Sequence, residues 1–403
     1  MTFLLELAGW LFFGYTALNV LYLTVWTWGA FVGTPDDRPE PPAEPDRYRR
    51  IAVLIPAYRE DAVIVESVRA NLRSQYPPER FDLVVIADGL QPETLAKLSE
   101  LPVRVVEVQL EKSSVSNALR AAMAALPADG YDVALISDAD NVLAPDFLRR
   151  INQAFARGWR VVQGHRTAKN TNTPTAILDA ISEELNNFFF RKGHRGLGFS
   201  AALIGSGMAF EYGLFRTHIE ASTAIGGYDK QLELFLLRDG YRIGYLESAL
   251  VYDEKVQSPV TFEHQRTRWV EAQLSQVRLH FLPGLRAGLR GNADYANKAL
   301  QTILLPRLLL LGSLCVGTLV CFVAGAWGWA SFVGAQALLL ATLLLLGLPD
   351  SLRQRLGPRV LVMVPVLFWR FCRSVLNVRK ARNRFLHTPH GVEADGAAEG
   401  LRV

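Results

Sequence analysis

The sequence predicts an α/β protein in which a mostly parallel, Rossmann-type sheet is attached to membrane helices at both ends of the chain. Three observations support this fold class. Uncharged apolar runs are concentrated near the two termini of the 403-residue chain instead of being spread along it. Between them, short β-rich runs alternate with helical patterns. The first β-rich run continues as "PAYRED", without a glycine-rich loop, which disfavours a dinucleotide-binding dehydrogenase or a P-loop enzyme.

The first predicted element is a transmembrane helix. The stretch from about Ala8 to Gly33 contains no charged side chain and is long enough to cross a hydrocarbon core of about 30 Å. A cleaved signal peptide is the alternative, but the run is too long for one, lacks a basic start and shows no small-residue cleavage site. We therefore assign residues 1–34 to an anchor helix and residues 35–50 to a linker.

The middle of the chain is predicted to form the sheet. Strands separated by crossover helices make right-handed βαβ units, and ligands bind beyond the carboxyl ends of such strands. This rule places residues 58–61, Asp88 and residues 138–141 at one edge of the sheet. The predicted strands are residues 51–56, 81–88, 103–108 and 131–140, followed by helices at 63–75, 92–100, 114–126 and 145–156.

Two carboxylates at the end of a predicted buried strand suggest a metal site. Asp138 and Asp140 flank one small residue in "ISDADN" and would repel each other unless a cation lay between them. Hard oxygen ligands select Mg²⁺ or Mn²⁺, and such an ion would stabilise a departing diphosphate. A turn or helix N-cap is the structural alternative, because Pro145 and a predicted helix follow.

The C-terminal third is predicted to contain a membrane hairpin and a surface helix. Residues 308–327 and 330–348 are uncharged runs joined by a short turn, so we assign residues 301–349 to the hairpin. The last apolar run, residues 360–369, precedes a basic cluster, and we interpret residues 350–403 as an amphipathic helix on the inner membrane surface with a basic tail. The cluster comprises Arg370, Arg373, Arg379, Lys380, Arg382 and Arg384.

The distribution of charge predicts an integral membrane protein whose soluble body faces the cytoplasm. By the positive-inside rule, arginines beside the apolar runs mark the cytoplasmic loops. They also account for the net charge of +4, so we expect membrane lipids as partners and no nucleic acid. The three cysteines show neither metal nor disulfide spacing. The arginines are Arg38, Arg47, Arg49, Arg50, Arg286, Arg290, Arg307, Arg353 and Arg355.

Six stretches, in this order, resemble the membrane-bound family 2 glycosyltransferases, which include cellulose synthases, hyaluronan synthases and ceramide glucosyltransferases. They are "IAVLIPAYRED", "VVIADG", "ISDADN", "GSGMAF", "GGYDKQLELFLLRDGYRIGYLESALVYDEK" and "QRTRW". The resemblance covers about residues 51–269 and implies a GT-A-like catalytic domain at residues 51–258, followed by interfacial helices at residues 259–300.

The resemblance also implies an activity. It is the inverting transfer of a hexose from a nucleotide-sugar, with a UDP-sugar expected, to a growing polysaccharide at the inner face of a bacterial plasma membrane. Three spans are few for one chain to enclose a polymer channel, so a homo-oligomer or an export partner is expected. Glycolipid synthesis is the first alternative. A catalytically silent scaffold or nucleotide-sugar sensor is the second.

The resemblance implies roles for individual residues. Glu60 and Asp88 would hold the base and ribose of the donor, and Asp138 and Asp140 would bind the metal, the second carboxylate directly. The acceptor would approach the backbone at Gly205, Ser206, Gly207 and Met208. Gln265, Arg268 and Trp269 would contact the donor, and Trp269 the acceptor as well. Gln265 and Trp269 are four residues apart and share one helix face, while guanidinium suits a diphosphate and an aromatic ring suits a sugar.

An inverting transfer needs a carboxylate to take the proton of the acceptor hydroxyl. The family uses a Glu-Asp pair before a "GYRI"-like turn, and this chain has no such pair in that region. Counting back from Gly240 places Asp229 on the family's aspartate, so Asp229 is the predicted base. Glu233, one helical turn further on, is the reserve. A helix N-cap is the structural alternative for Asp229.

Several further polar residues are candidates for contacts with the donor or acceptor. Asn117 replaces a family lysine that contacts the diphosphate, and Lys112 or Arg120 would substitute for it. Of the polar side chains between residues 163 and 195, most are expected on a solvated helix face. Three are candidate ligands of donor or acceptor: His165, Arg166 and Lys169. Residues 253–255 are predicted to position the loop of the base.

Overall fold

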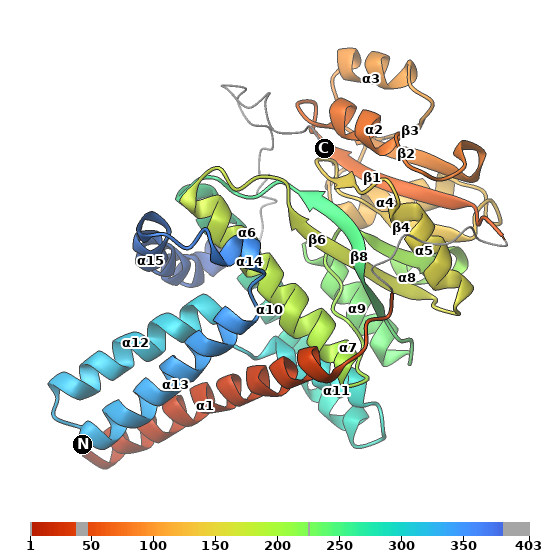
Figure 1. Ribbon diagram of the computed structural model, residues 1–403. Coiled ribbons are helices and arrows are strands. Elements are labelled where there is room, and N and C mark those ends of the chain that lie inside the picture. The colour runs from red at the N-terminus through yellow and green to blue at the C-terminus, as the bar shows by residue number, and fades with distance from the viewer. Residues whose placement is uncertain (1, 38–46, 225, 382–403) are drawn as a thin grey trace.

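The computed structural model describes residues 2–37, 47–224 and 226–381. In these residues one mixed sheet has the strand order β3-β2-β1-β4-β7-β6-β8-β5 (Figure 1). Strands β1 to β4 are parallel to their neighbours in this group, whereas β7 runs antiparallel to both β4 and β6. The predicted mostly parallel α/β sheet is confirmed. The strands are β1 Ile51–Tyr58, β2 Phe81–Asp88, β3 Arg104–Val108, β4 Val133–Ile136, β5 Val142–Leu143, β6 Val161–Ala168, β7 Met208–Glu211 and β8 Gly244–Asp253.

Helices cover both faces of the sheet because strands such as β1 and β4 carry apolar side chains on both faces. Successive side chains of a strand point to opposite faces, so Val53 and Ile55 join one core while Ala52 and Leu54 join the other. The first core is covered by α2 Ile64–Asn71, α3 Pro92–Ser99 and α5 Phe147–Ala156. The second is covered by α4 Val115–Ala125, α8 Tyr212–Glu220 and α9 Tyr228–Arg238. A short 3₁₀ turn, η1 Pro78–Arg80, precedes β2.

A long helical segment joins the sheet to the N-terminal helix. Helix α6 Pro174–Asn186 continues through the π-helical segment η2 Asn187–Gly193 into α7 His194–Gly196. The N-terminal helix α1 Thr2–Val32 crosses this segment where glycines of both meet, because a Cβ added at Gly29 would lie 2.4 Å from the carbonyl oxygen of Gly193. The glycines therefore allow the two backbones to approach closely.

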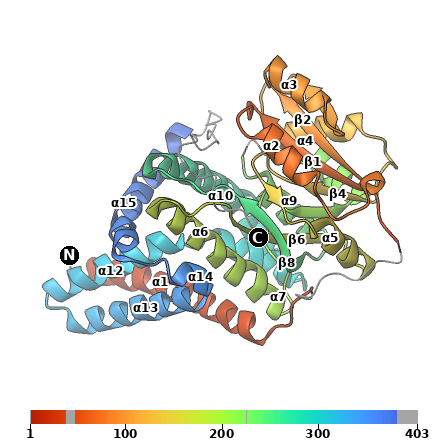
Figure 2. The same ribbon diagram turned by 45° about the horizontal axis from the view of Figure 1, so that its top comes forward.

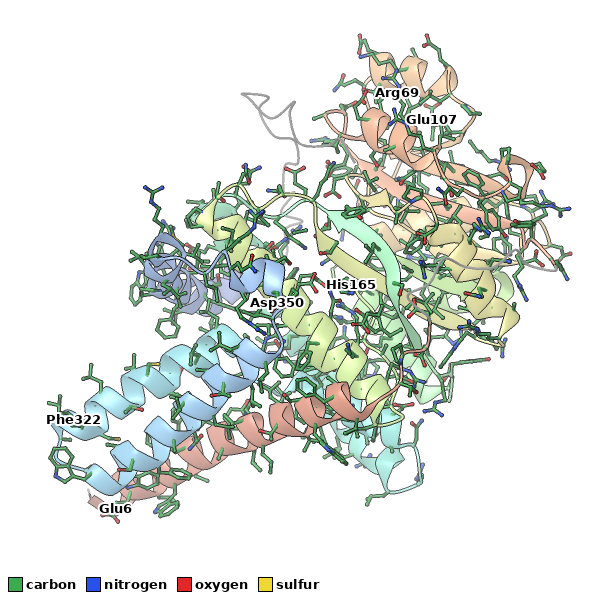
Figure 3. All side chains as sticks on the ribbon, viewed as in Figure 1. Glu6, Arg69, Glu107, His165, Phe322 and Asp350 are labelled. Atoms are coloured by element: carbon green, nitrogen blue, oxygen red, sulfur yellow. The ribbon has the colours of Figure 1, made fainter. Side chains whose placement is uncertain are left out.

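Three apolar helices form a bundle that projects from the body. Helix α1 packs with α12 Arg307–Val323 and α13 Trp327–Leu346, and many apolar side chains on their outer surfaces are exposed. Glu6 and Phe322 lie at the end of the bundle far from the sheet, and Asp350 lies at the near end (Figure 3). An exposed apolar surface of this extent is what a bilayer would cover.

Length and hydropathy single out two described helical stretches as able to cross a membrane, Trp327–Leu346 and Pro358–Asn377. A third candidate arises if α11 Ala293–Thr302 and α12, which meet at a bend of 54°, form one broken span. Helix α1 is not among these candidates, so its membrane span stays a prediction. The two C-terminal candidates agree with the number of C-terminal spans expected from the sequence, but one of them is a different helix.

That helix is α15 Pro358–Ala381, which is longer than the predicted apolar run and long enough to span. It nevertheless runs across the direction of α1, α12 and α13 (Figure 2) and packs against α10 Pro259–Gly288. Arg370 and Arg373 pair with Glu263 of α10 at 2.9 and 3.5 Å. These two cations thus hold α15 to α10, whereas we expected them to face lipid.

The short helix α14 Asp350–Arg353 connects the end of α13 to α15. Three of the arginines with predicted roles, Arg38, Arg382 and Arg384, lie outside the described residues. The linker after α1 is attached to the sheet, because Asp36 accepts hydrogen bonds from Tyr245 N and the Arg195 guanidinium, and Asp37 accepts from Glu247 N and Ser248 N.

Candidate active site

The ends of β1 and β2 bring the two predicted donor-binding carboxylates to one edge. Tyr58 and Asp88 are partners in the parallel register, and Arg59 N donates to Asp88 O at 3.1 Å. Outside glycine, Arg59 is the described residue with a positive φ, 55°, which turns the chain sharply into Glu60. Backbone strain of this kind costs roughly 1–3 kcal/mol and is concentrated at functional sites. Glu60 and Asp88 therefore lie together at the carboxyl edge, as predicted.

The Asp138–Asp140 segment follows β4 and is held by hydrogen bonds from two other parts of the chain. Asp138 N donates to Ser206 Oγ at 3.0 Å, and Glu254 N donates to Asp140 Oδ2 at 3.3 Å. With its amide oriented to satisfy both of its ends, Asn141 donates to Asp140 Oδ1 at 3.0 Å and accepts from Ser206 Oγ at 2.7 Å. These contacts position both carboxylates before any ligand binds.

The two carboxylates differ in exposure. The Asp138 side chain is 36% exposed, whereas Asp140 is only 4% exposed because the backbone after β8 covers it. We expected the second carboxylate to bind the metal directly. In this structure Asp138 is the more accessible of the two.

Both side chains suit a divalent ion that arrives with its substrate. Their donor atoms are carboxylate oxygens, which are the ligands that Mg²⁺ and Mn²⁺ prefer. Within the described ranges, no group of three or more His, Cys, Asp or Glu side chains is arranged to hold a metal. Mg²⁺ is commonly held by one or two carboxylates together with substrate phosphates and water. The donor set therefore fits a nucleotide-bound ion better than a permanent all-protein site.

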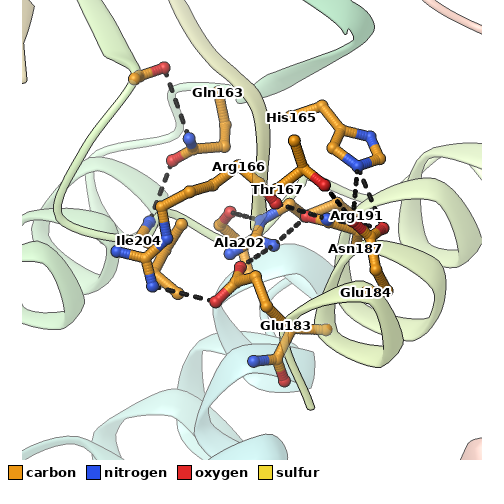
Figure 4. A network of polar contacts seen from close by, with 12 residues as sticks. Gln163, His165, Arg166, Thr167, Glu183, Glu184, Asn187, Arg191, Ala202 and Ile204 are labelled. Carbon is orange, nitrogen blue, oxygen red and sulfur yellow. Dashed lines mark hydrogen bonds and ion pairs between the residues drawn. The ribbon is translucent and has the colours of Figure 1, made fainter. Parts of the chain in front are cut away.

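A buried arginine, Arg166, lies close to Asp138, and Figure 4 shows its contact with Glu183. Arg166 on β6 places Nη1 3.9 Å from Asp138 Oδ2, Nη2 2.9 Å from Glu183 Oε2 and Nε 3.7 Å from Asp253 Oδ2. Burial alone would lower the pKa of Arg166, but Asp253, Glu183 and Asp138 raise it well above its usual value. The sheet thus holds a buried cation beside the Asp138 carboxylate.

Glu183 on α6 holds this cation in place. Its second oxygen, Oε1, lies 3.0 Å from Nη1 of Arg191, so one buried carboxylate pairs with two buried guanidinium groups. Burial would raise the pKa of Glu183, but Arg166, Arg191 and Lys255 lower it far below its ordinary value of 4.5. The solvated helix face expected for this segment is therefore wrong: Glu183, Glu184, Asn187 and Arg191 are buried.

Glu183→Gln is expected to destabilise the fold strongly. Removing one partner of a buried charge pair costs about 3–5 kcal/mol, because the other charges stay buried and unpaired. A group with a depressed folded-state pKa stabilises the fold above its unfolded pKa and loses that contribution as pH falls. The difference in apparent Tm between wild type and variant should therefore be large at pH 7 and narrow as pH falls below 4.5.

The matched control is Glu247→Gln, because Glu247 pairs with Lys192 at 2.8 Å on the surface. Exposed pairs contribute about 0–1 kcal/mol, so this variant should keep nearly the wild-type Tm. Equal Tm values for wild type and Glu183→Gln at pH 7 would show that the buried pair does not stabilise the fold.

The predicted acceptor loop lies against the aspartate segment. Gly205 and Gly207 have φ values of +43° and +69°, and a Cβ added at Gly205 would lie 3.6 Å from Asp138 Oδ2. Ser206 is fully buried and holds Asp138, so its side chain does not face an acceptor. Met208 is the first residue of β7. It is also fully buried, and its side chain belongs to the second core. A Cβ added at Gly207 would lie 2.7 Å from Val251 Cγ2, so this glycine also faces the interior, and acceptor binding at Gly205 stays a prediction.

Asp229 lies in the first turn of α9, next to this loop. Gly227 begins the helix with φ +66°, and the Tyr228 hydroxyl donates to Gly205 O at 2.6 Å, which ties the helix start to the acceptor loop. The Asp229 side chain is 14% exposed, and its Oδ2 lies 3.5 Å from Lys230 Nζ. The first turn of a helix favours a carboxylate, which suits Asp229 to this position beside the loop.

Glu233, the reserve candidate, is placed differently. Its side chain is 2% exposed, pairs with Lys298 Nζ at 2.5 Å and accepts from Leu203 N at 3.2 Å. Both oxygens are therefore occupied in the interior. The geometry favours Asp229 over Glu233 as the base.

Helix α10 carries the predicted Gln265–Trp269 surface past the start of α9. A Cβ added at Gly227 would lie 2.9 Å from Cβ of Ala272, one helical turn beyond Trp269, so the two helices touch there. Gln265 Oε1 is buried and has no hydrogen-bond partner among the described residues. Trp269 is 39% exposed. The Trp269 ring is therefore partly accessible, whereas the Gln265 acceptor atom lies inside the structure.

A neighbouring arginine, Arg266, organises this surface, and its role was not predicted from the sequence. The Arg266 guanidinium lies between two rings, 4.7 Å from Phe262 and 4.0 Å from Trp269, and pairs with Asp179 Oδ1 of α6 at 2.7 Å. Asp179 and Glu183 are four residues apart on α6. One helix face therefore positions both Arg266 under the tryptophan and Arg166 behind Asp138. The four-residue spacing of Asp179 and Glu183, which puts two carboxylates on one helix face, was a signal for this arrangement in the sequence, although it does not show whether that face is buried.

The two remaining candidate ligands of donor or acceptor, His165 and Lys169, lie in different surroundings. His165 is held by Glu184 at 3.0 Å and by the Tyr245 hydroxyl at 2.8 Å, which is a structural arrangement. Lys169 Nζ lies 3.5 Å from Asp140 O and so does reach the aspartate segment.

The other two predictions concern charged groups at the sheet edge. Residues 253–255 contact Arg166 and Asp140, so they hold the aspartate segment instead of the base loop. The Arg120 guanidinium donates to Asn117 Oδ1, and the Asn117 amide donates to Lys112 O. These contacts place neither Lys112 nor Arg120, the candidate replacements for the family lysine, next to the aspartate segment.

Comparisons with known proteins show the family to which the chain belongs. A family model described as "Glycosyltransferase like family 2" matches residues 48–272. The chain is 24% identical over 296 residues to a beta-monoglucosyldiacylglycerol synthase of Synechocystis sp., covering 62% of this chain and 58% of that protein. It is 26% identical over 255 residues to cellulose synthase 1 of Komagataeibacter xylinus, covering 59% of this chain and 16% of that protein. The chain spans less than two thirds of the length of these curated relatives.

Among solved structures, a mannosyltransferase of Pyrobaculum calidifontis, in complex with GDP-Man and Mn²⁺, is similar with a TM-score of 0.49 and 17% identity. The similarity covers 82% of this chain and 96% of that chain.

Proposed function

Because the chain belongs to glycosyltransferase family 2, we propose that it is an inverting, metal-dependent hexosyltransferase that uses a nucleotide-sugar, with a UDP-sugar as the expected donor. Its sheet, with two aspartates after the central strand β4, agrees with the GT-A-like fold that the resemblance implied. The observation that carries the proposal is the direct contact between three parts of the chain: the aspartate segment, the acceptor loop and the start of α9. Ser206 joins the acceptor loop to Asp138, and Tyr228 joins the same loop to the first turn of α9, which carries Asp229.

Each residue has a defined task in this mechanism. Glu60 and Asp88 hold the nucleoside at the ends of β1 and β2, and Arg166 supplies a fixed positive charge near the diphosphate. Mg²⁺ or Mn²⁺, held by Asp138 and Asp140, would neutralise the leaving diphosphate when bound. Asp229 takes the proton of the acceptor hydroxyl while that oxygen attacks the anomeric carbon and the bond to the diphosphate breaks on the opposite face.

We propose a lipid-anchored acceptor, which reverses the order of the two acceptors expected from the sequence. Leu23 of α1, Leu310 of α12 and Leu340 of α13 belong to one buried apolar cluster, and the buried Thr16 of α1 is hydrogen-bonded to Gln336 of α13. Side chains packed in this way argue against a polymer channel between the three described helices. A lipid acceptor needs none, because its hydroxyl approaches α10 along the membrane surface.

Polysaccharide synthesis is the second candidate, and the Gln265–Trp269 motif favours it. In that case a polymer would leave through an oligomer or an export partner. In either case we propose that the bundle lies in a bacterial plasma membrane and that the body faces the cytoplasm. The exposed apolar surface of α1, α12 and α13, with the sheet at one end only, supports a body on one side of the membrane (Figure 1), and the positive-inside rule favours the cytoplasmic side.

The test is a panel of radiolabelled nucleotide-sugars added to the full chain reconstituted in bilayers containing diacylglycerol, with the products sized and their linkage determined. A single labelled glycolipid that forms only with Mg²⁺ or Mn²⁺ is expected, and a ladder of polymers would favour the second candidate. Binding of UDP without turnover of any donor would contradict both and would favour a catalytically silent sensor.

A further inference from the structure

A hollow of about 500 Å³ lies away from the candidate active site, between the start of α6 and the connection from α14 to α15. The second wall follows soon after α13, a candidate membrane span, ends at Leu346. The hollow is therefore at the end of the bundle nearest the sheet, where Figure 1 shows α6, α14 and α15 beside one another. Its lining residues are Asn172, Thr173, Pro174, Ile177, Arg355, Gly357, Pro358, Arg359 and Val360.

The walls combine positive charge with apolar surface. Arg355 and Arg359 are both exposed, and no acidic residue is in the lining. Ile177 and Val360 supply apolar atoms, and the exposed side chains of Leu361 and Val362 continue this surface along α15. A ligand that matches both features has an anionic head and an apolar tail.

We propose that this hollow binds an anionic phospholipid of the surrounding membrane. The two guanidinium groups would hold the phosphate, for which their planar donors are suited, and the acyl chains would lie along the exposed apolar side of α15. Basic pockets beside membrane helices on the cytoplasmic side are suited to such head groups. The site does not depend on the transfer reaction, and binding can be tested without any donor or acceptor.

The position of the hollow connects the membrane to the active-site edge. Arg355 Nη1 donates to Thr171 Oγ1 at 2.7 Å, in the loop between β6 and α6. The same loop carries Lys169, which reaches Asp140 O, and Asn170, which pairs with the backbone of Lys255. A lipid phosphate on Arg355 would thus lie one hydrogen bond from the loop that contacts the aspartate segment.

The test is native mass spectrometry of the detergent-purified full chain, titrated with phosphatidylglycerol or phosphatidylcholine of the same acyl composition. We expect one phosphatidylglycerol to be retained with at least about tenfold preference, because each basic residue favours an anionic head group. Arg355→Gln combined with Arg359→Gln should abolish this preference. The matched control is Arg286→Gln combined with Arg290→Gln, which removes the same charge outside the hollow and should keep it.

Three outcomes would overturn the proposal: no preference in the wild type, an unchanged preference in the hollow variant, or an equal loss in both double variants, which would indicate general attraction to basic surface. Inorganic phosphate at the same concentration should not displace the lipid, since it lacks acyl chains, and displacement would overturn the role of the apolar wall. Because Arg355 also contacts Thr171, Arg359→Gln alone keeps the test possible if the double variant does not accumulate, and it should weaken the preference.

Discussion

Asp229→Asn is expected to lower the turnover number for sugar transfer by about 10²- to 10⁴-fold, which is the usual contribution of a general base. Asparagine has nearly the same shape but cannot accept the proton of the attacking hydroxyl. Because Asp229 is not part of the Asp138–Asp140 segment, binding of UDP and Mn²⁺ should not change. The measurement is steady-state transfer with the identified donor, together with calorimetry of nucleotide binding.

Asp129→Asn, the same substitution at an exposed position, is the control and should behave as wild type. If Asp229→Asn retained near-normal turnover, the assignment of the base would be wrong. Glu233→Gln does not distinguish a base from a structural residue by activity alone, because Glu233 pairs with Lys298 in the interior. A fall in Tm for Glu233→Gln, without one for Asp229→Asn, would confirm the division of roles that the geometry favours.

Asp140→Ala is expected to abolish Mn²⁺-dependent binding of UDP and to lower transfer by at least about 10²-fold. A bound metal supplies several kcal/mol of transition-state stabilisation, and each 1.36 kcal/mol corresponds to about a factor of ten in rate. Asp138→Ala should have a similar effect, since Asp138 is the more exposed carboxylate of the two. Calorimetry with UDP, with and without Mn²⁺, measures the loss directly.

Glu79→Ala removes an exposed carboxylate far along the chain from these residues and is the control, with unchanged binding expected. Retention of Mn²⁺-dependent UDP binding in both aspartate variants would exclude the metal site. Retention in Asp140→Ala alone would mean that Asp138 is the ligand and that Asp140 only supports the segment through Glu254 N and Asn141.

The strands and helices of the first half were predictable because each has a local signal. Strand β2 matches its prediction at both ends, Phe81 and Asp88, since an apolar run from Leu83 to Ala87 lies between a proline-containing turn and a glycine. Helix α2 ends at Asn71, four residues before the predicted end, because Asn71 is held by the neighbouring β5 segment through Leu143 N. The antiparallel insertion of β7 between β4 and β6 had no local signal, since pairing partners far apart in sequence are chosen by the tertiary fold.

The site shows the same division. Residues with a strand-end position or a motif, such as Asp88, Asp138 and Asp140, could be identified because chemistry and position coincide in the sequence. Glu183 and Asp179 could not, because a polar helix pattern does not reveal whether its polar side is solvated or buried against other charges. For Met208 and Ser206 the motif was correct, but the direction of each side chain depends on the strand that begins there.

The sequence by itself determined the mostly parallel sheet, its polar carboxyl edge and the ordered motifs of the family, because these depend on residue type and spacing along one segment. Only the tertiary structure decided which polar groups are accessible and which are internal supports. In the folded chain, Arg166 of β6 and Arg266 of α10 both pair with carboxylates of α6. Asp229 lies near the acceptor loop, whereas Glu233 is buried in an ion pair with Lys298. These outcomes depend on burial and on charges brought together from distant segments, and neither quantity is a property of one segment alone.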